Sequence, residues 1–546
     1  MQNLLLVKNK SNILLVFLTI FLLICAKPIY GTTDDYILNS WLNGTYTGSS
    51  EKESIFITSI FSNSLSYLYS IFPNISWYAF VLLLVTLAAI VTLNQNIYRN
   101  NKISSSTKNL NLIILASYLT WSILGITYTA TAIIAGVAGW VSIKEWLVNE
   151  KKQTFIIACL FTLLSICIRP ESFLGATLII SPFILFKIKI NRTIILKLVL
   201  FTSFVVSVLL LHRYMESKST NDMKEYTNWA KKVQMFAGRP RMSDATKVIG
   251  NTGWTVSEYH LFADLAYFDN SNFNTKWIDQ GIKATDKISN RPIMNYEKIK
   301  KITVEYFKSL TIFGYTLFII FILFLYSMTK NKNRLAVSFV ALTYIIIHFL
   351  SGLFLHNVSR VTIPFLVVLC YMLLHFVQLD FKNRYLNFTS AFFALIFVVF
   401  FVQQNTTNIH KIESAEIYRS SIVVEQKDRI VFIQGNQEYF QNSNPFVALS
   451  KDPDPNVFMV GNWDTFSPQW FKRAKLIGLN ENSLINSLLT NPKVYWSGPT
   501  VPDTMSHLIN YLKESGYGEF EPVKVGLLPN GNQLWNFAKS GVRSES

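Results

Sequence analysis

The chain has 546 residues, of which 50% are hydrophobic and 15% are charged, and its mean hydropathy is +0.29. Long apolar segments recur along it, which is typical of a polytopic membrane protein and excludes an ordinary soluble globular chain. The net charge of +17 would fit a nucleic-acid-binding protein, but the basic residues lie mostly where membrane topology requires them, so we expect no nucleic-acid partner.

Eleven apolar windows are long enough to cross a hydrocarbon core of about 30 Å. The first of them follows Lys8 and Lys10 and could also be a secretory signal peptide. Because ten further windows follow, we interpret it as an uncleaved span. The predicted spans cover about residues 13–30, 77–94, 110–127, 129–147, 154–168, 173–187, 194–212, 309–329, 335–355, 361–379 and 386–403.

Alternate connections between these spans are basic, and their only acids are Glu145, Glu150 and Asp380. The positive-inside rule therefore places them in the cytoplasm, with the N-terminus, and places the C-terminal region outside a plasma (inner) membrane. The basic residues of these connections are Lys8, Lys10, Arg99, Lys102, Lys108, Lys144, Lys151, Lys152, Lys187, Lys189, Arg192, Lys197, Lys330, Lys332, Arg334, Lys382 and Arg384.

The first outer loop, residues 31–76, opens with Asp34 and Asp35 directly after the first span. Its segment 54–72 is apolar over much of a helical circumference but is interrupted by Ser and Asn. Another span here would break the alternation of charge, so we predict a helix lying on the membrane surface.

The second outer loop, residues 213–308, is predicted to be mostly helical. Thr255 and Glu258 have the spacing of a capping box, which would open a helix over 256–268. An amphipathic run over 296–310 leads into the eighth span. Between the fifth and sixth spans, which are short, Arg169 and Glu171 would lie just below the outer surface, a depth at which charge is usually functional.

Residues 404–546 are predicted to form a small soluble α/β domain, after a transmembrane domain that covers residues 1–403. A closing hairpin is indicated by two short β-type runs separated by Pro529-Asn-Gly-Asn. The expected strands are 429–434, 457–460, 494–497, 523–528 and 533–537, with a helix over 505–515.

Several polar residues at the outer side could carry chemistry. A carboxylate such as Asp34 or Asp35 at the membrane surface can act as a general base, or the pair could share a divalent cation such as Mg or Mn, although a helix cap is the competing interpretation. Arg169 can bind a leaving phosphate, with Glu171 either holding the Arg in place or touching sugar hydroxyls, unless the two only form a structural ion pair. His356 and Arg360 could form one face of a phosphate clamp, unless Arg360 reaches up to the lipid headgroups.

An Asp pair after the first span, a membrane-lying helix in the first outer loop, many further spans and an outer C-terminal domain together resemble the GT-C superfamily. Its members are integral-membrane glycosyltransferases that use polyprenyl-phosphate sugars. A closer resemblance, to uncharacterised bacterial membrane proteins, rests on four phrases. They are Leu68–Trp77, Arg169–Glu171, Gly253–Phe262 with Asp269, and Asn357–Pro364.

The resemblance implies that Asp34 or Asp35 is the catalytic base and that Glu258 and Asp269 contact sugar. The third phrase more often carries Asp where this chain has Glu258. The sequence therefore predicts an all-α GT-C-like membrane protein of about eleven spans with a small outer α/β domain. It would move a sugar, with inversion, from a polyprenyl-phosphate donor among the membrane lipids to an outer acceptor. A transporter or flippase of a lipid-linked saccharide and a non-catalytic scaffold are the alternatives.

Overall fold

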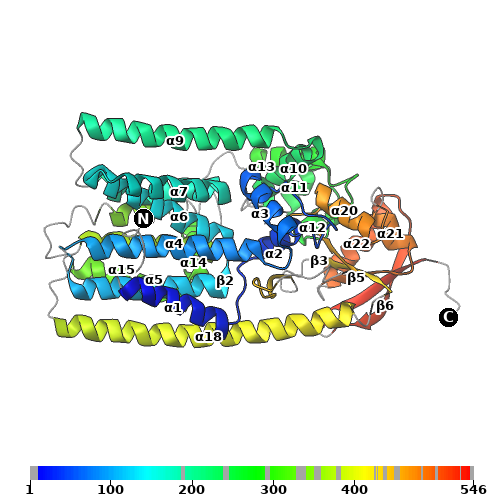
Figure 1. Cartoon of the computed structure of the whole chain (residues 1–546). Helices are drawn as coiled ribbons and strands as arrows, with labels where there is room; N and C mark the ends of the chain where they lie inside the picture. The colour runs from blue at the N-terminus through cyan, green and yellow to red at the C-terminus, as the bar shows by residue number, and fades with distance from the viewer. Residues whose placement is uncertain are drawn as a thin grey trace.

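In the computed structural model, a long bundle of helices occupies one end of the molecule and a β-sheet with its covering helices occupies the other (Figure 1). Short helices lie between the two parts. The structure describes residues 10–101, 103–185, 191–237, 245–288, 296–327, 338, 340–347, 349, 358–376, 383–423, 426, 428–434, 440–447, 455–480, 484–498, 502–528 and 531–540.

The bundle helices correspond to ten of the predicted apolar windows, while the window at 335–355 lies largely outside the described residues. Four described helices are long and apolar enough to cross a membrane, and the pair Ile299–Ser309 and Phe313–Ile322, bent by 115°, would make a fifth span. The protein is therefore a membrane protein, and the full count of eleven spans stays a prediction. The bundle helices are α1 (Lys10–Cys25), α4 (Trp77–Arg99), α5 (Ser105–Leu124), α6 (Tyr128–Asn149), α7 (Lys152–Ile168), α8 (Pro170–Leu185), α9 (Arg192–Ser217), α15 (Ile312–Ser327), α17 (Ser359–Phe376) and α18 (Asn383–Val423).

Helix α6 is the centre of the bundle, because most of its side chains are buried against α4, α7 and α8. Glycines allow this close approach: a Cβ atom on Gly136 would lie 2.9 Å from Ser165 Oγ, and one on Gly139 would lie 2.8 Å from Thr162 Oγ1. Helix α9, in contrast to α6, has few buried side chains. It lies along the edge of the bundle with its apolar side chains exposed (Figure 1), as expected of a helix that faces lipid.

A short parallel pair, β1 (Ile29–Tyr30) and β2 (Gly125–Ile126), joins the start of the first loop to the α5–α6 connection. The predicted first span is too long as a helix, because α1 ends at Cys25 and the chain is already extended at Ile29. The amide of Gly31 donates to Ile126 O at 2.6 Å. This pairing brings the two aspartates beside the first residue of α6.

The first loop contains two helices, α2 (Thr33–Leu42) and α3 (Ser59–Ile71). Helix α3 is the predicted surface helix, but it begins at Ser59 rather than at residue 54 because Thr58 caps it and accepts from Phe61 N. Helix α2 begins at the aspartate pair, with Thr32 as its N-cap. The stretch is therefore a helix start, but its cap is Thr32 and not an aspartate.

The described parts of the second loop, residues 213–308, are mostly helical as predicted, and the capping box of Thr255 and Glu258 is present. The predicted helix over 256–268 is too long, because it ends at Ala263 and Leu265 adopts a left-handed φ of 57°. The helices of this loop are α10 (Asn221–Ala237), α11 (Ala245–Thr252), α12 (Val256–Ala263), α13 (Thr275–Ile288) and α14 (Tyr296–Ser309).

The C-terminal region contains a mixed five-stranded sheet of order β4-β3-β5-β7-β6. Helix α18 passes through residue 404, where the domain boundary is predicted, and the first strand of this sheet begins at Ile430. The predicted closing hairpin is confirmed as the antiparallel pair β6–β7. The elements are β3 (Ile430–Gln434), β4 (Val457–Val460), α20 (Pro468–Leu476), α21 (Leu484–Thr490), β5 (Val494–Gly498), α22 (Pro502–Glu514), β6 (Phe520–Leu527) and β7 (Gln533–Lys539).

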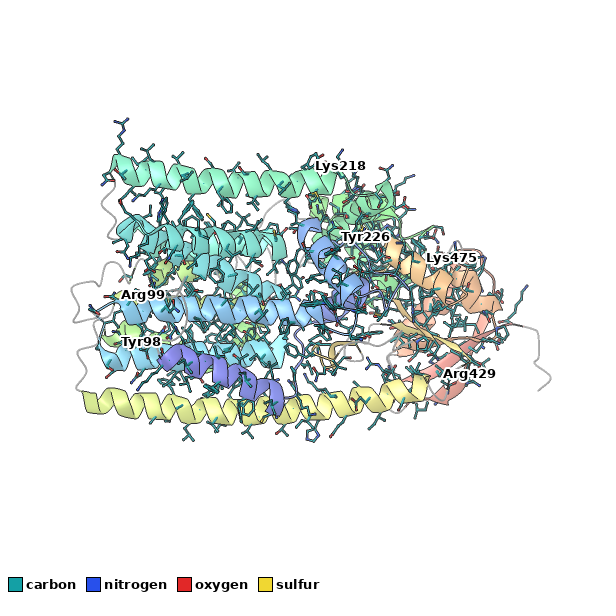
Figure 2. All side chains as sticks on the ribbon, in the orientation of Figure 1. Tyr98, Arg99, Lys218, Tyr226, Arg429 and Lys475 are labelled. Atoms are coloured by element: carbon teal, nitrogen blue, oxygen red, sulfur yellow. The ribbon has the colours of Figure 1, made fainter. Side chains whose placement is uncertain are left out.

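The C-terminal region packs on the first loop. Lys472 Nζ lies 3.0 Å from both carboxylate oxygens of Glu51, and Gln441 Nε2 donates to Gly31 O at 3.2 Å. In Figure 2, Tyr226 lies at this sheet-facing end of the bundle, whereas Tyr98 and Arg99 lie at the opposite end. The aspartate pair is therefore held between the bundle and the sheet.

Candidate functional site

Asp35 is fully buried, and both of its carboxylate oxygens are occupied. Oδ2 accepts from the Thr32 hydroxyl at 2.6 Å, and Oδ1 accepts from the Tyr78 hydroxyl at 2.7 Å and from Tyr128 N at 3.0 Å. Burial raises the pKa of this carboxyl to about 6, even though these hydrogen bonds oppose the shift. Asp35 thus ties the start of α2 to the starts of α4 and α6.

Asp34 has a different environment, because consecutive residues of a helix point in different directions. Its Oδ2 lies 3.1 Å from Arg360 Nη1 at the start of α17, in an ion pair whose side chains are 18% and 26% exposed. Asp34 is therefore the member of the doublet that a substrate can reach.

Arg169, between α7 and α8, is held by neutral groups. Its Nη1 donates to the Tyr128 hydroxyl at 3.0 Å and to Thr129 Oγ1 at 2.7 Å, and its guanidinium lies over the Tyr128 ring at 5.1 Å. Glu171 lies 3.9 Å from Arg169 Nε and is 77% exposed, so the predicted ion pair is present but long and solvated. The guanidinium therefore keeps most of its ability to attract an anion.

Tyr128 connects the predicted site residues to one another. Its amide binds Asp35, its hydroxyl binds Arg169, and the charges of Asp34 and Arg360 also act on that hydroxyl. The aspartates and both arginines therefore converge on the first turn of α6, at one end of the bundle, as the sequence predicts. Sequence reasoning missed Tyr128 and Tyr78, because tyrosines at the ends of spans are ordinary interfacial residues.

Glu258 and Asp269 have other partners. Glu258 Oε2 accepts from Thr255 N at 2.8 Å in the capping box. Asp269 is buried and accepts from the hydroxyls of Tyr511 and Tyr517, each at 2.7 Å, so it joins the second loop to the sheet region. Their predicted sugar contact stays a prediction, and among the described contacts neither residue touches Asp34, Arg169 or Arg360. His356 lies outside the described residues.

The doublet does not have the geometry of a shared cation site. Both oxygens of Asp35 are occupied by donors from the protein, and Asp34 faces a guanidinium. Within the described residues, no three His, Cys, Asp or Glu side chains gather as metal ligands. A Mg or Mn ion held jointly by Asp34 and Asp35 is therefore not supported by their arrangement.

No protein-family model and no curated protein matches this chain. Among solved structures, the chain is similar to ArnT from Cupriavidus metallidurans in its apo state, with a TM-score of 0.40 and 10% identity. It is also similar to the same protein bound to undecaprenyl phosphate, with a TM-score of 0.41 and 10% identity. Each match covers 97% of this chain and 98% of the other. A similarity of this size carries no conclusion about individual side chains.

Proposed function

We propose that the protein is a membrane glycosyltransferase of GT-C type that transfers a sugar from a polyprenyl-phosphate donor to an acceptor outside the cytoplasm. One observation carries the proposal: an accessible carboxylate, Asp34, lies 3.1 Å from Arg360, and a second guanidinium, Arg169, is held nearby by neutral hydroxyls. A base and two phosphate ligands are the groups that such a transfer requires.

In the proposed reaction, the acceptor hydroxyl gives its proton to Asp34 while its oxygen forms a bond to the anomeric carbon. The bond between that carbon and the phosphate oxygen breaks, and the electron pair leaves with the phosphate. Arg169 and Arg360 stabilise the charge that develops on the leaving group. Direct displacement inverts the anomeric centre, since no carboxylate attacks that carbon.

We assign the role of the base to Asp34 because the two aspartates have different environments. Asp35 is 0% exposed, and three donors occupy its oxygens, so it cannot reach an acceptor without losing contacts that hold α2, α4 and α6 together. Asp34 needs only to release Arg360. The two guanidinium groups also supply the positive charge that a divalent cation would otherwise provide, so the proposed transfer requires no metal.

The experiment compares Asp34→Asn with Asp279→Asn in a deletion strain of the native host. Asp279 lies on α13, pairs with Lys232 and is 39% exposed, which makes it a matched control outside the site. With both variants present at wild-type levels, we expect Asp279→Asn to restore the surface glycan and Asp34→Asn to abolish the transfer. If Asp34→Asn restores the glycan fully, the proposal is wrong, and a transporter or scaffold explains the phenotype better.

A further inference from the structure

The turn after β4, residues 461–467, lies between the C-terminal sheet, the first loop and α10. Tyr46 of the first loop donates its hydroxyl to Asp464 Oδ2 at 3.1 Å, and Tyr226 of α10 donates to Trp463 O. Gly461 has a φ of 72°, and a Cβ atom there would lie 1.6 Å from Leu265 O. The turn is thus held against three separate segments of the chain.

Four buried polar atoms at this turn have no hydrogen-bond partner among the described residues. They are Asp464 Oδ1, Trp463 Nε1, Thr465 Oγ1 and Trp41 Nε1. The rings of Trp41 and Trp463 are 5.2 Å apart, and Trp463, Asp464 and Thr465 are consecutive, so the four residues are neighbours. Folded proteins rarely leave buried polar groups unpaired, so each of these atoms calls for a partner such as an ordered water, an ion or a bound ligand.

An aromatic surface connects this cluster to Arg169. The ring of Trp463 is 4.6 Å from that of Phe56, which lies 6.3 Å from the ring of Tyr128, whose hydroxyl binds Arg169. Trp463 and Phe56 are half-buried, so part of their surface is accessible. A phosphate at Arg169 would therefore place a group attached to it along Phe56 toward Trp463.

We propose that Trp463 and Asp464 form the subsite for the sugar ring of the lipid-linked donor. The inference rests on the proposed function and adds where the transferred group lies. The apolar face of the sugar would stack on the rings of Phe56 and Trp463, and its hydroxyls would satisfy Asp464 Oδ1 and the indole N–H groups. Asp464 is itself fully buried, so the side chains that cover it must move for a sugar hydroxyl to reach Oδ1.

The charges around this subsite favour an uncharged sugar over an anionic one. Burial, with a smaller contribution from the Asp34 carboxylate, raises the pKa of Asp464 to about 7, so near neutral pH its carboxyl can donate as well as accept a hydrogen bond. A sugar carboxylate would have to be desolvated beside the buried carboxyl of Asp464. We therefore expect neutral hexoses or pentoses to bind and uronic acids to be rejected.

The test measures binding of three probes to the purified full-length protein in lipid nanodiscs. They are a polyprenyl phosphate, the same lipid esterified at its phosphate with each of a panel of neutral hexoses and pentoses, and the same lipid esterified with glucuronate. In the wild type, one neutral sugar should strengthen binding over the bare lipid phosphate, and glucuronate should not. Asp464→Leu and Trp463→Phe should each reduce this gain about tenfold while binding of the bare lipid phosphate stays unchanged, the size expected when a ligand hydroxyl loses one hydrogen-bond partner.

Matched controls are Asp279→Leu on α13 and Trp535→Phe on β7, neither of which should change any of the three affinities. If no neutral sugar adds affinity, or if the two subsite variants weaken bare and sugar-bearing lipid equally, the subsite proposal is overturned. Failure of the wild type to bind the bare lipid phosphate would instead count against the proposed function, since that probe does not engage the subsite.

Discussion

Arg360 Nη1 and Asp34 Oδ2 are 3.1 Å apart, so the proposed base and one of the proposed phosphate ligands neutralise each other before substrate binds. Arg169, in contrast, is held by the hydroxyls of Tyr128 and Thr129. An incoming phosphate would meet Arg169 first and then compete with Asp34 for Arg360. Donor binding would in this way free the base only when the leaving group is in position.

Substitutions of the two partners should therefore have opposite effects on lipid-phosphate affinity. Asp34→Asn frees Arg360 and should strengthen binding of a polyprenyl phosphate by about threefold to tenfold, whereas Arg360→Gln should weaken it by at least about tenfold. Native mass spectrometry of the protein in nanodiscs measures both affinities. A loss of binding in Asp34→Asn would contradict this competition.

Arg169 should require its guanidinium and not only its charge. Arg169→Lys keeps the charge but lacks the planar fork that binds a phosphate through two N–H groups, so we expect about tenfold weaker lipid-phosphate binding. Arg213→Lys, an exposed position at the end of α9, is the matched control and should leave the affinity unchanged. The same binding assay measures both variants. If Arg169→Lys and Arg213→Lys bind the lipid phosphate equally well, Arg169 is not part of the site.

Asp35 should make stability depend on pH. Its pKa is about 6 in the folded protein against an ordinary value of 3.8, so the folded state holds this proton more tightly than the unfolded chain does. The contribution to stability is therefore fully present below about pH 3.8 and is lost as the pH rises to about 6. Thermal unfolding in detergent across this range should show the decline.

The matched variant for this effect is Asp35→Asn, whose amide can still accept from Tyr78 and Tyr128 and can donate to Thr32. It should fold, and its unfolding temperature should change less between about pH 4 and pH 6 than that of the wild type. Burial raises the pKa of Asp464 to about 7, so its contribution to stability is also lost as the pH rises, over a range that extends to about pH 7. Asp464→Asn should therefore make the unfolding temperature less dependent on pH in the upper part of this range. A wild-type stability that rises with pH throughout this range would contradict both assignments.

Gly461 should be intolerant of any side chain. Gly461→Ala places a Cβ atom against Leu265 O and also strains a φ of 72°, so the turn that carries Trp463 and Asp464 must shift. Gly478→Ala is the control, because its φ of 80° imposes a similar strain of about 1 kcal/mol but its Cβ meets nothing within 4 Å. We expect a clearly larger loss of unfolding temperature in Gly461→Ala, and equal losses would show that the contact with Leu265 is unimportant.

Several features were predictable because they depend on neighbours in the sequence. Most apolar windows became helices, the strand runs became the C-terminal sheet, and Thr255 and Glu258 formed their capping box. The alternation of basic connections predicted that Asp34, Arg169 and Arg360 share one end of the bundle. Charge alternation requires no knowledge of the packing, since each connection is assigned by its own residues.

Tertiary structure alone decided the environments of these residues. Asp34 and Asp35 are adjacent and chemically identical in the sequence, and they differ only because Tyr78 and Tyr128 enclose one of them while Arg360 meets the other. The continuation of α18 through residue 404 and the placement of Asp464 against Tyr46 likewise depend on contacts between distant segments. Burial and long-range hydrogen bonding, which local sequence does not specify, separate the buried carboxyl from the accessible one.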